Sequence, residues 1–480
     1  MSYNNDRYPQ FSYLRIRKNA VRGAHMNYGK QKRNCHKVIT LIDIVLAAYP
    51  VWAIWKGVVS LAENGYGQRA LILATAFFIL LYIEFGRIYE AFDVSLHKIA
   101  EIVYAQGLTI VASDIIMAIV GWLTWRTLPT AGRLTLMLII QFGLLCMWTI
   151  LGKKWCERTC PPQPTAIIYD ERAGMERLIA EYKLQNRFSV VLTGKVEDCL
   201  DNMELLSDVQ VVFLSGVRSH DRNVILKHCI RENKDVFVIP RIGDVLMSGA
   251  VPMHMFHLPM LKVEGYSASP EYLFIKRVLD ILLSLTAIVL LSPLMLISAI
   301  LIKATDGGPV LYRQTRLTQN GRPFEILKFR SMYVNAEQDG IARLSTGVND
   351  LRVTPIGKII RKFRIDELPQ IFNILRGDLS ICGPRPERPE IAAQYCETMP
   401  EFALRLQAKA GLTGYAQVYG KYNTTPYDKL QMDLMYIAHP SIIQDLKIML
   451  ATVKVIFIPE STEGVAEGQV TAEKNELEKV

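Results

Sequence analysis

Four long apolar runs dominate the first third of the chain. They lie at about residues 38–60, 70–89, 101–124 and 134–152. Each run is close to the roughly 20 residues that an α-helix needs to cross a bilayer. The pattern therefore predicts a domain of four transmembrane helices over residues 37–155.

The stretch before these runs, residues 1–36, is basic and lacks apolar periodicity. Nine lysines and arginines occur in the first 37 residues, against one acid, Asp6. The positive-inside rule places such an arm in the cytoplasm, and we expect it to be flexible. Four crossings then return the chain to the cytoplasm, where Lys153, Lys154 and Arg158 follow.

Two carboxylates, Asp43 and Asp114, fall inside the apolar runs. Ionisable residues in a membrane are functional candidates by default. Here a structural role is favoured, because Asp43 lies near a helix end and neither residue has an obvious basic partner.

Residues 161–264 have the alternating pattern of a soluble α/β unit. The segments TAIIYD, FSVVLTG, VQVVFLSG and DVFVIP are typical of strands, and helical stretches separate them. This order predicts a small, parallel, Rossmann-like domain. The first strand is followed by DERAG and not by the glycines of a dinucleotide-binding loop. We therefore expect a structural, regulatory or dimerising role instead of dinucleotide binding.

A fifth apolar run, Ile281–Ile302, carries no charge and is long enough to cross the bilayer. Pro293 interrupts it, however, and basic residues such as Lys276 and Lys303 flank both ends. A helix that enters and returns to the same side should be cationic on both flanks. The pattern therefore predicts a re-entrant helix, in which the hydroxyl of Ser292 can bond to a backbone group freed by the proline.

The remaining residues up to 458 predict a domain of short helices, strands and loops. Residues 441–457 form an amphipathic pattern, which fits equally a helix on the membrane surface and one that faces the core. Residues 459–480 form an acidic tail with few large apolar residues, typical of disorder. The predicted fold class is thus membrane α plus α/β, with a catalytic domain over residues 270–458.

Composition narrows the class of partner. Half of the residues are hydrophobic and the net charge is +9. In a membrane protein this excess indicates attraction to anionic lipid of the bilayer and to phosphorylated substrates. We expect no nucleic acid, because the chain has neither zinc-finger spacing nor an RNP-type aromatic signature.

The cysteines form no CxxC pair and are scattered: Cys35, Cys146, Cys156, Cys160, Cys199, Cys229, Cys382 and Cys396. Cys156 and Cys160 have the spacing of half a metal site, but the sequence offers nothing for the other half. Free thiols in a reducing cytoplasm are expected.

The strongest chemical signal is the segment Lys358–Pro386. It places two adjacent carboxylates, Asp366 and Glu367, among the cations Arg361, Lys362, Arg364, Arg376 and Arg385. Such cations hold phosphate oxygens while one carboxylate attacks phosphorus and another binds a divalent metal. The alternative is a solvated charged helix. On a helix, adjacent side chains point about 100° apart, so the pair suits two different roles at one phosphate.

The string DELPQIFNILRGDLSICGPRP in this segment resembles the signature of the bacterial sugar transferases, or polyprenyl-phosphate hexose-1-phosphate transferases. Further matches in order are KRVLD (276–280), KFRSM (328–332) and GLTGYAQVYGK (411–421). The resemblance is close over residues 272–458 and looser, toward the long-form monotopic members, in the N-terminal half. It implies the same re-entrant helix.

The resemblance implies a reaction in two steps. Asp366 is the expected nucleophile, and Glu367 is expected to hold Mg²⁺. A UDP-sugar would give up UMP and leave an aspartyl phosphosugar, which a polyprenyl phosphate, such as undecaprenyl phosphate, then accepts. This would be the first membrane step of capsule or exopolysaccharide synthesis, at the cytoplasmic face of the bacterial inner membrane. Glucose or galactose is the expected sugar, and homo-oligomerisation is left open.

Further positions match the family motifs. The resemblance implies phosphate binding by Lys276, Arg277, Arg330, Arg361, Arg385 and Lys421, with Asp280 and Asp378 as other family positions. The chain departs from the family at Ala410, where proline is usual, and at Lys421, where arginine is usual. Lysine keeps the charge but loses the planar fork that binds phosphate bidentately.

Two other functions compete with this hypothesis. A membrane-bound NAD-dependent nucleotide-sugar dehydratase or epimerase needs a Tyr-x-x-x-Lys pair, and Tyr272 and Lys276 have that spacing. That pair adjoins the broken apolar run, and the only GxGxxA-like string, residues 65–70, lies between two predicted spans. A non-enzymatic scaffold of the polysaccharide machinery is the other alternative, against which the intact carboxylate pair argues.

Overall fold

The structure is a computed structural model that describes residues 9–59, 67–95, 97–170, 172–266, 268–334, 352–420 and 424–456. It divides into two compact units, Met1–Pro240 and Arg241–Val480. The predicted acidic tail, residues 459–480, lies outside the described residues, as does Lys421.

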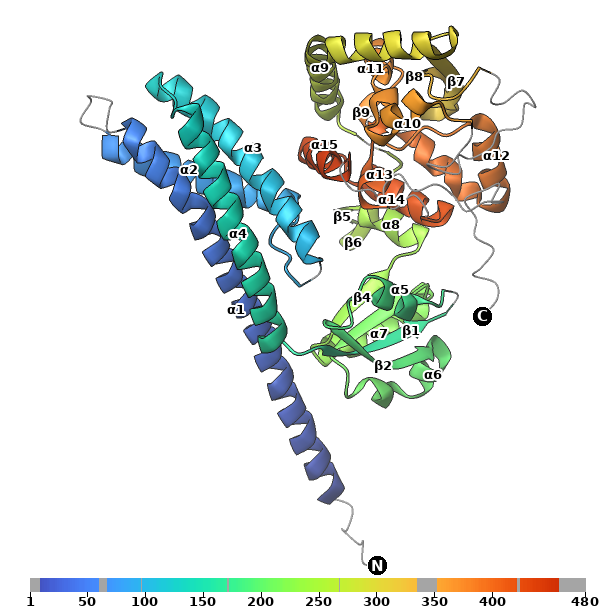
Figure 1. Cartoon of the computed structure of the whole chain (residues 1–480). Coiled ribbons are helices and arrows are strands. Elements are labelled where there is room, and N and C mark those ends of the chain that lie inside the picture. Colours follow the sequence, from blue (N-terminus) through green and yellow to red (C-terminus); the bar gives the residue numbers. More distant parts are fainter. Residues whose placement is uncertain are drawn as a thin grey trace, which may run out of the picture. The chain divides into compact units, whose positions relative to one another are not determined.

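The first unit begins with long apolar helices, which Figure 1 shows lying side by side: α1 (Pro9–Val59), α2 (Gly67–Ile88), α3 (Ile99–Trp125) and α4 (Ala131–Thr159). In the described residues, five helices are long and apolar enough to cross a membrane: these four and α9 (Pro270–Asp306). The chain is therefore a membrane protein. Residues 9–36, predicted as a flexible arm, continue the helix of the first apolar run.

A buried polar network joins the helices of this bundle. Asp43 accepts hydrogen bonds from the Tyr82 hydroxyl at 3.1 Å and from Gln106 Nε2 at 3.0 Å. The Thr149 hydroxyl donates to Gln106 Oε1 at 2.7 Å. These bonds satisfy the buried carboxylate and connect all four helices, which supports the structural role favoured for Asp43.

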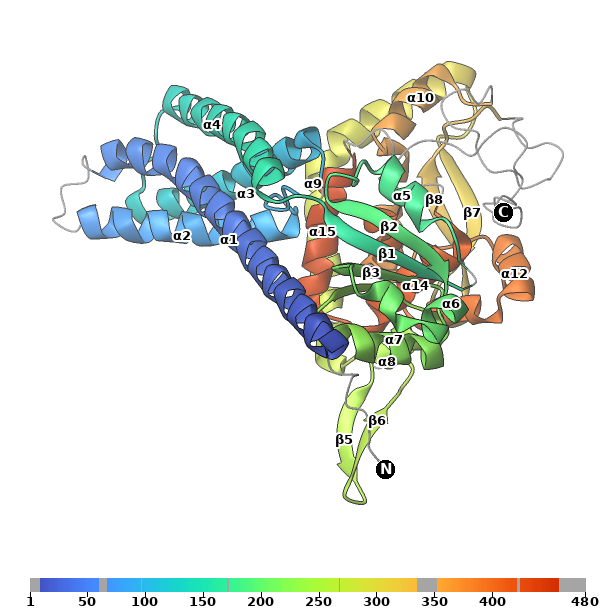
Figure 2. The ribbon, with the colours of Figure 1, turned by 90° about the horizontal axis from the view of Figure 1, so that it is seen from below.

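The first unit ends in the predicted parallel α/β fold. Its sheet has the order β2-β1-β3-β4, all parallel: β1 (Gln163–Tyr169), β2 (Phe188–Lys195), β3 (Val211–Ser215) and β4 (Asp235–Ile239). Figure 2 shows β2, β1 and β3 side by side. The intervening helices are α5 (Met175–Glu181), α6 (Val196–Asp201), the 3₁₀ turn η1 (Met203–Leu206) and α7 (Ser219–Arg231). The prediction of a parallel α/β region is confirmed.

The second unit begins earlier than the sequence predicts. Helix α8 (Ile242–Ser248) packs against α14 (Pro426–Ala438), and the antiparallel hairpin β5–β6 (Val251–Met255, Leu258–Lys262) follows α8. Figure 2 shows the hairpin projecting away from α8. Residues 241–264, assigned to the Rossmann-like domain, therefore lie with the C-terminal unit, because strand alternation alone does not reveal which core a short helix joins.

The body of the second unit is built from short elements. The hairpin β7–β8 (Leu311–Leu317, Pro323–Phe329) is antiparallel, and β9 (Ser380–Cys382) pairs in parallel with β10 (Gly411–Thr413). The surrounding helices are α10 (Pro355–Lys362), α11 (Gln370–Arg376), α12 (Pro389–Thr398), α13 (Tyr415–Tyr419), α14 and α15 (Ile442–Ile456), with 3₁₀ turns η2 (Gln319–Gly321), η3 (Ile365–Glu367) and η4 (Pro400–Gln407).

Helix α9 (Pro270–Asp306) contains Pro293, and Figure 1 shows it changing direction sharply partway along its length. Proline cannot donate the backbone hydrogen bond to Val289, four residues earlier. The Ser292 hydroxyl donates to that Val289 carbonyl at 3.1 Å. This serine therefore bonds to the carbonyl that the proline cannot reach.

Both halves of α9 pack on the same unit. Asp280, in the first half, accepts a hydrogen bond from the backbone N–H of Ile381 at 3.0 Å. In the second half, Ile302 is buried with Phe329 and Ile360. The bend between the halves is apolar and exposed, with Val289 73% accessible.

Helix α15 has two apolar faces. Ile448 is buried in the core of the unit, whereas Ile443 is 66% exposed on the helix. One face therefore packs against the core, as the core-facing interpretation predicts. The other face is exposed and apolar, which is also compatible with contact to a membrane surface.

Candidate active site

The carboxylate pair lies on a short turn between two helices. Helix α10 ends at Lys362, and Arg364 adopts a left-handed conformation with φ of 53°. Asp366 and Glu367 follow in the 3₁₀ turn η3, because Pro369 cannot donate the bond to Ile365 that a continuous α-helix requires. The expected α-helix is therefore wrong at this point. A 3₁₀ turn separates adjacent side chains by about 120°, so the inference of two different roles still holds.

Three cations surround Glu367. Its Oε1 lies 3.5 Å from Lys328 Nζ and 3.4 Å from Arg385 Nη2, and its Oε2 lies 3.6 Å from Arg364 Nη1. Burial alone would raise the pKa of Glu367, but these cations outweigh it and lower the pKa to about 2. Glu367 is thus ionised and neutralised by its neighbours.

Asp366 differs from its neighbour in both its contacts and its pKa. Within the described residues, its half-buried carboxylate makes no hydrogen bond or ion pair. Burial first, and then the Glu367 charge, raise the pKa of Asp366 to about 6, against the opposing effect of Lys328, Arg361 and Arg364. At neutral pH this carboxylate is ionised and none of the described residues bonds to it, as a nucleophile requires.

The strand β8 supplies cations that the sequence analysis only partly recognised. Lys328 was not among the predicted site residues, although it starts the KFRSM motif. Residues two apart on a strand share a face. Lys328 stands two residues before the predicted Arg330, so this spacing could have identified Lys328 as a further site residue. Arg330 is buried, with its guanidinium against Gly308. Arg361 donates from Nε to the Ser331 hydroxyl at 2.7 Å and so lies beside the same strand end.

Arg385 is held by a second row of charged residues. Arg405 Nη2 donates to the Arg385 carbonyl at 2.8 Å and lies 2.6 Å from the buried Asp433. Arg316 Nη1 donates to the Pro386 carbonyl at 3.1 Å. These two arginines lie outside the matched motifs, and the sequence carries no signal that would have identified them.

The loop before Arg385 packs backbone against backbone. A Cβ added at Gly383 would clash with the Lys409 carbonyl, and one at Gly411 would clash with the Gly383 backbone. The departure at Ala410 has a structural consequence here. Its backbone N–H donates to the Thr318 hydroxyl at 3.3 Å, a bond that the usual proline could not make.

The side chains of α9 that were predicted to bind phosphate instead bond to other residues of the same unit. Lys276 Nζ lies 2.7 Å from Oδ2 of the buried Asp445, and the lysine side chain is itself only 11% exposed. Arg277 donates to the carbonyls of Ile374 and Leu375 at 2.6 and 2.7 Å. These two residues and Asp280 anchor α9 and are not brought to the carboxylate pair, so their phosphate-binding role stays a prediction.

Asp378, the remaining family position, pairs with Arg322 at 2.9 Å. Its carbonyl accepts a hydrogen bond from the Thr318 hydroxyl at 2.9 Å. Asp378 therefore stabilises the loop that follows α11. The carboxylate pair, in contrast, lies in the turn that precedes this helix.

The carboxylate pair fits Mg²⁺ in donor type and number. Mg²⁺ is usually bound by one or two carboxylates together with substrate phosphates. Among the described residues, no third acidic or histidine ligand joins Asp366 and Glu367 in one cluster. The remaining ligands of such an ion would be phosphate oxygens of a substrate. The cations around the two carboxylates outnumber them, so the site favours a further anionic group.

The fold and this site fit a class: a membrane-associated phosphotransferase, in which cations gather around a pair of carboxylates. A sequence profile described as bacterial sugar transferase matches residues 271–459. The chain is 41% identical over 344 residues to the UDP-N-acetylgalactosamine-undecaprenyl-phosphate N-acetylgalactosaminephosphotransferase of Aeromonas hydrophila, covering 71% of this chain and 77% of that protein. This chain belongs to the bacterial sugar transferase family.

Two further relatives support this assignment. Over 183 residues the chain is 43% identical to the UDP-glucose:undecaprenyl-phosphate glucose-1-phosphate transferase of Caulobacter vibrioides, covering 37% of this chain and 68% of the relative. A protein of the same name from Escherichia coli is 26% identical over 447 residues, covering 87% and 88%. The protein is thus a phosphotransferase, and the dehydratase, epimerase and scaffold alternatives are set aside.

Proposed function

We propose that this protein transfers a sugar 1-phosphate from a UDP-sugar to undecaprenyl phosphate and releases UMP. The relatives' names supply both substrates. The single observation that carries the mechanism is a contrast between neighbours. Three cations neutralise Glu367, whereas Asp366 is ionised and has no hydrogen-bond or ion-pair partner among the described residues.

In the first step, a carboxylate oxygen of Asp366 attacks the sugar-bearing β-phosphorus. An O–P bond forms to the aspartate, and the bond from this phosphorus to the bridging oxygen breaks, so UMP leaves. Arg361 and Arg385 are the groups that bind the phosphate oxygens, because a guanidinium fork matches two of them. Mg²⁺, held by Glu367 when bound, supplies charge neutralisation of the diphosphate.

In the second step, a phosphate oxygen of the lipid attacks the same phosphorus. The O–P bond to Asp366 breaks, and the free carboxylate returns with the polyprenyl diphosphate sugar as product. Covalent catalysis separates the two reactions, so the nucleotide and the bulky lipid need not be bound together.

The shape of α9 supports delivery of the lipid. A straight helix of 37 residues would extend about 55 Å, longer than a bilayer core is thick. Here both halves pack on the unit that carries the site. One buried cluster is contacted both by α9, through Met295 and Ala299, and by the residues flanking the carboxylate pair, Ile365 and Leu368. We infer that α9 is re-entrant and holds Asp366 at the cytoplasmic face of the inner membrane.

The test is UMP release by the full-length protein in lipid nanodiscs, screened over UDP-N-acetylgalactosamine, UDP-glucose and UDP-galactose. Asp366→Asn should lower the rate by several orders of magnitude, as loss of a covalent nucleophile does. The matched control Asp208→Asn, an exposed aspartate in the first unit, should keep it.

Mass spectrometry without the lipid acceptor distinguishes the mechanism from direct transfer. A phosphosugar adduct on Asp366 is expected, and near-normal turnover by Asp366→Asn would rule that residue out as nucleophile. Glu367→Gln should weaken both activity and its dependence on Mg²⁺, whereas an unchanged magnesium titration would remove Glu367 as the ligand.

A further inference from the structure

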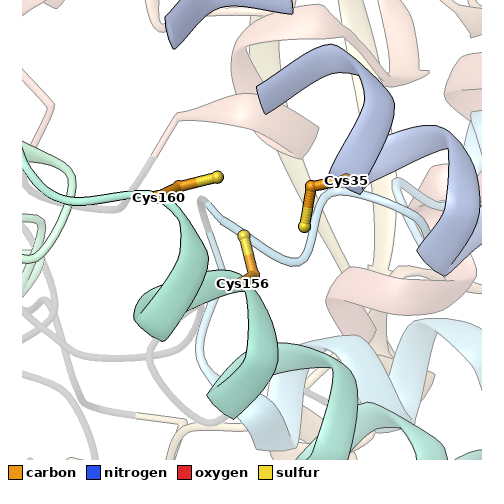
Figure 3. A group of neighbouring side chains, drawn as sticks. All are labelled: Cys35, Cys156 and Cys160. Carbon is orange, nitrogen blue, oxygen red and sulfur yellow. The ribbon is translucent and has the colours of Figure 1, made fainter. Parts of the chain in front are cut away.

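Three cysteines from distant parts of the sequence meet in the first unit. Cys35 lies in α1, Cys156 in the last turn of α4, and Cys160 is the C-terminal cap of α4. Their sulfur atoms all lie within 4.8 Å of one another. Figure 3 shows the three side chains gathered around one point. We call this group the thiol triad; Cys35 is the partner that the sequence did not reveal.

The arrangement follows from helix geometry and packing. Residues four apart on a helix share a face, and Cys160 N–H bonds to the Cys156 carbonyl at 2.9 Å, so the last turn stays intact. The packing of α1 on α4 brings Cys35 to that face. Ile39 and Ile102 are buried beside Cys35 and close the inner side of the triad.

The spacing suits a metal of the zinc class. Tetrahedral Zn²⁺ binds thiolates at about 2.3 Å, which places neighbouring sulfurs about 3.8 Å apart. Sulfurs already within 4.8 Å reach that separation through small side-chain rotations. We propose that the thiol triad binds one thiophilic divalent cation such as Zn²⁺, with the fourth position filled from solvent.

Two other roles for these cysteines explain less. Buried cysteines often act as small apolar side chains, but Cys156 and Cys160 are only half-buried, so core packing does not account for them. All eight cysteines lie in the described residues and none is disulfide-bonded. A disulfide would use two of the three thiols and leave the third without a role.

The position of the triad suits a metal that links two helices of the first unit. The metal would tie α1 to the end of α4, with two residues between Cys160 and the start of β1 at Gln163. Because it binds only the folded arrangement, it should stabilise this junction of bundle and sheet.

The experiment measures metal on the full-length protein in nanodiscs under reducing conditions. After equilibration with Zn²⁺ and removal of excess, we expect about one zinc per chain, and Co²⁺ should give a thiolate charge-transfer absorption band. Cys35→Ser, Cys156→Ser and Cys160→Ser should each lower bound zinc at least tenfold. Cys146→Ser, elsewhere in α4, and Cys396→Ser should retain it.

Two further measurements keep the proposal falsifiable if a serine variant misfolds. Cys160→His keeps a metal ligand and should retain cobalt binding with a weaker charge-transfer band, and zinc should raise the thermal midpoint of the wild type but not of Cys35→Ser. Wild-type protein that binds no zinc after full reduction, or serine variants that bind it normally, would overturn the proposal. None of these readouts depends on transferase activity.

Discussion

At the scale of single residues, the site assigns different states to two neighbouring carboxylates. Burial affects both, but the cations lie against Glu367, so its pKa falls while that of Asp366 rises to about 6. Pairs of groups whose environments move their pKa values apart commonly have distinct catalytic roles. Lys328 is central to this contrast, since it approaches Glu367 from β8 and also lowers the pKa of Asp366.

This contrast predicts the pH dependence of the reaction. Attack requires the ionised form of Asp366, whose pKa is raised, so activity is present above about pH 6 and lost below it. We expect the rate of single-turnover UMP release to fall about tenfold per pH unit below that value. Lys328→Met removes a charge that favours the ionised form, so it should move the acid limb to higher pH.

The control for this experiment is Lys227→Met, which removes an exposed lysine in the first unit and should leave the profile unchanged. A rate that stays constant down to pH 4.5 in the wild type would show that Asp366 ionisation does not limit the reaction. A bound cation would shift the limb downward without changing its slope.

At the scale of elements, α9 is anchored by a buried ion pair to α15. Lys276→Met would leave the Asp445 carboxylate buried without its cation, although the hydroxyls of Tyr272 and Tyr436 would still bond to it. Breaking a buried pair in this way costs about 3–5 kcal/mol of unfolding free energy. Chemical unfolding of the protein in detergent should show that loss, whereas Lys303→Met, at the exposed end of α9, should have little effect. Unchanged stability together with weaker use of lipid substrate would instead support phosphate binding by Lys276.

The bend in α9 gives a second prediction at this scale. Pro293→Ala restores the backbone hydrogen bond to Val289 and favours a straight helix. We expect a loss of transfer to undecaprenyl phosphate, because Asp366 would no longer be held at the membrane surface. Pro270→Ala, at the first position of the same helix, removes a proline where no bond is lost and should retain activity. Full activity in Pro293→Ala would show that the bend is dispensable.

At the scale of the whole molecule, the proposed re-entrant helix fixes the topology. Four crossings and one return would place both ends of the chain in the cytoplasm, whereas a spanning α9 would place the C-terminus outside. Reporter fusions at the C-terminus should therefore report a cytoplasmic location. A fusion in the segment between α3 and α4, residues 126–130, should report the outside and serves as the control. An external C-terminus would refute the proposed orientation.

The sequence by itself determined the local patterns: the apolar helices, the parallel α/β region, the carboxylate pair and the proline break with its serine. Periodicity and contiguous motifs encode such features, because neighbours in the chain are neighbours in space. The unit boundary after Pro240 and the left-handed conformation of Arg364, just before the carboxylate pair, became visible only in the structure.

Only the tertiary structure decided which distant residues meet. Lys328 and Glu367 are 39 residues apart, and Lys276 and Asp445 are 169 apart. Cys35 reaches Cys156 only because α1 packs on α4. Such contacts depend on how helices and strands pack against one another, and a single sequence carries no local signal of that packing.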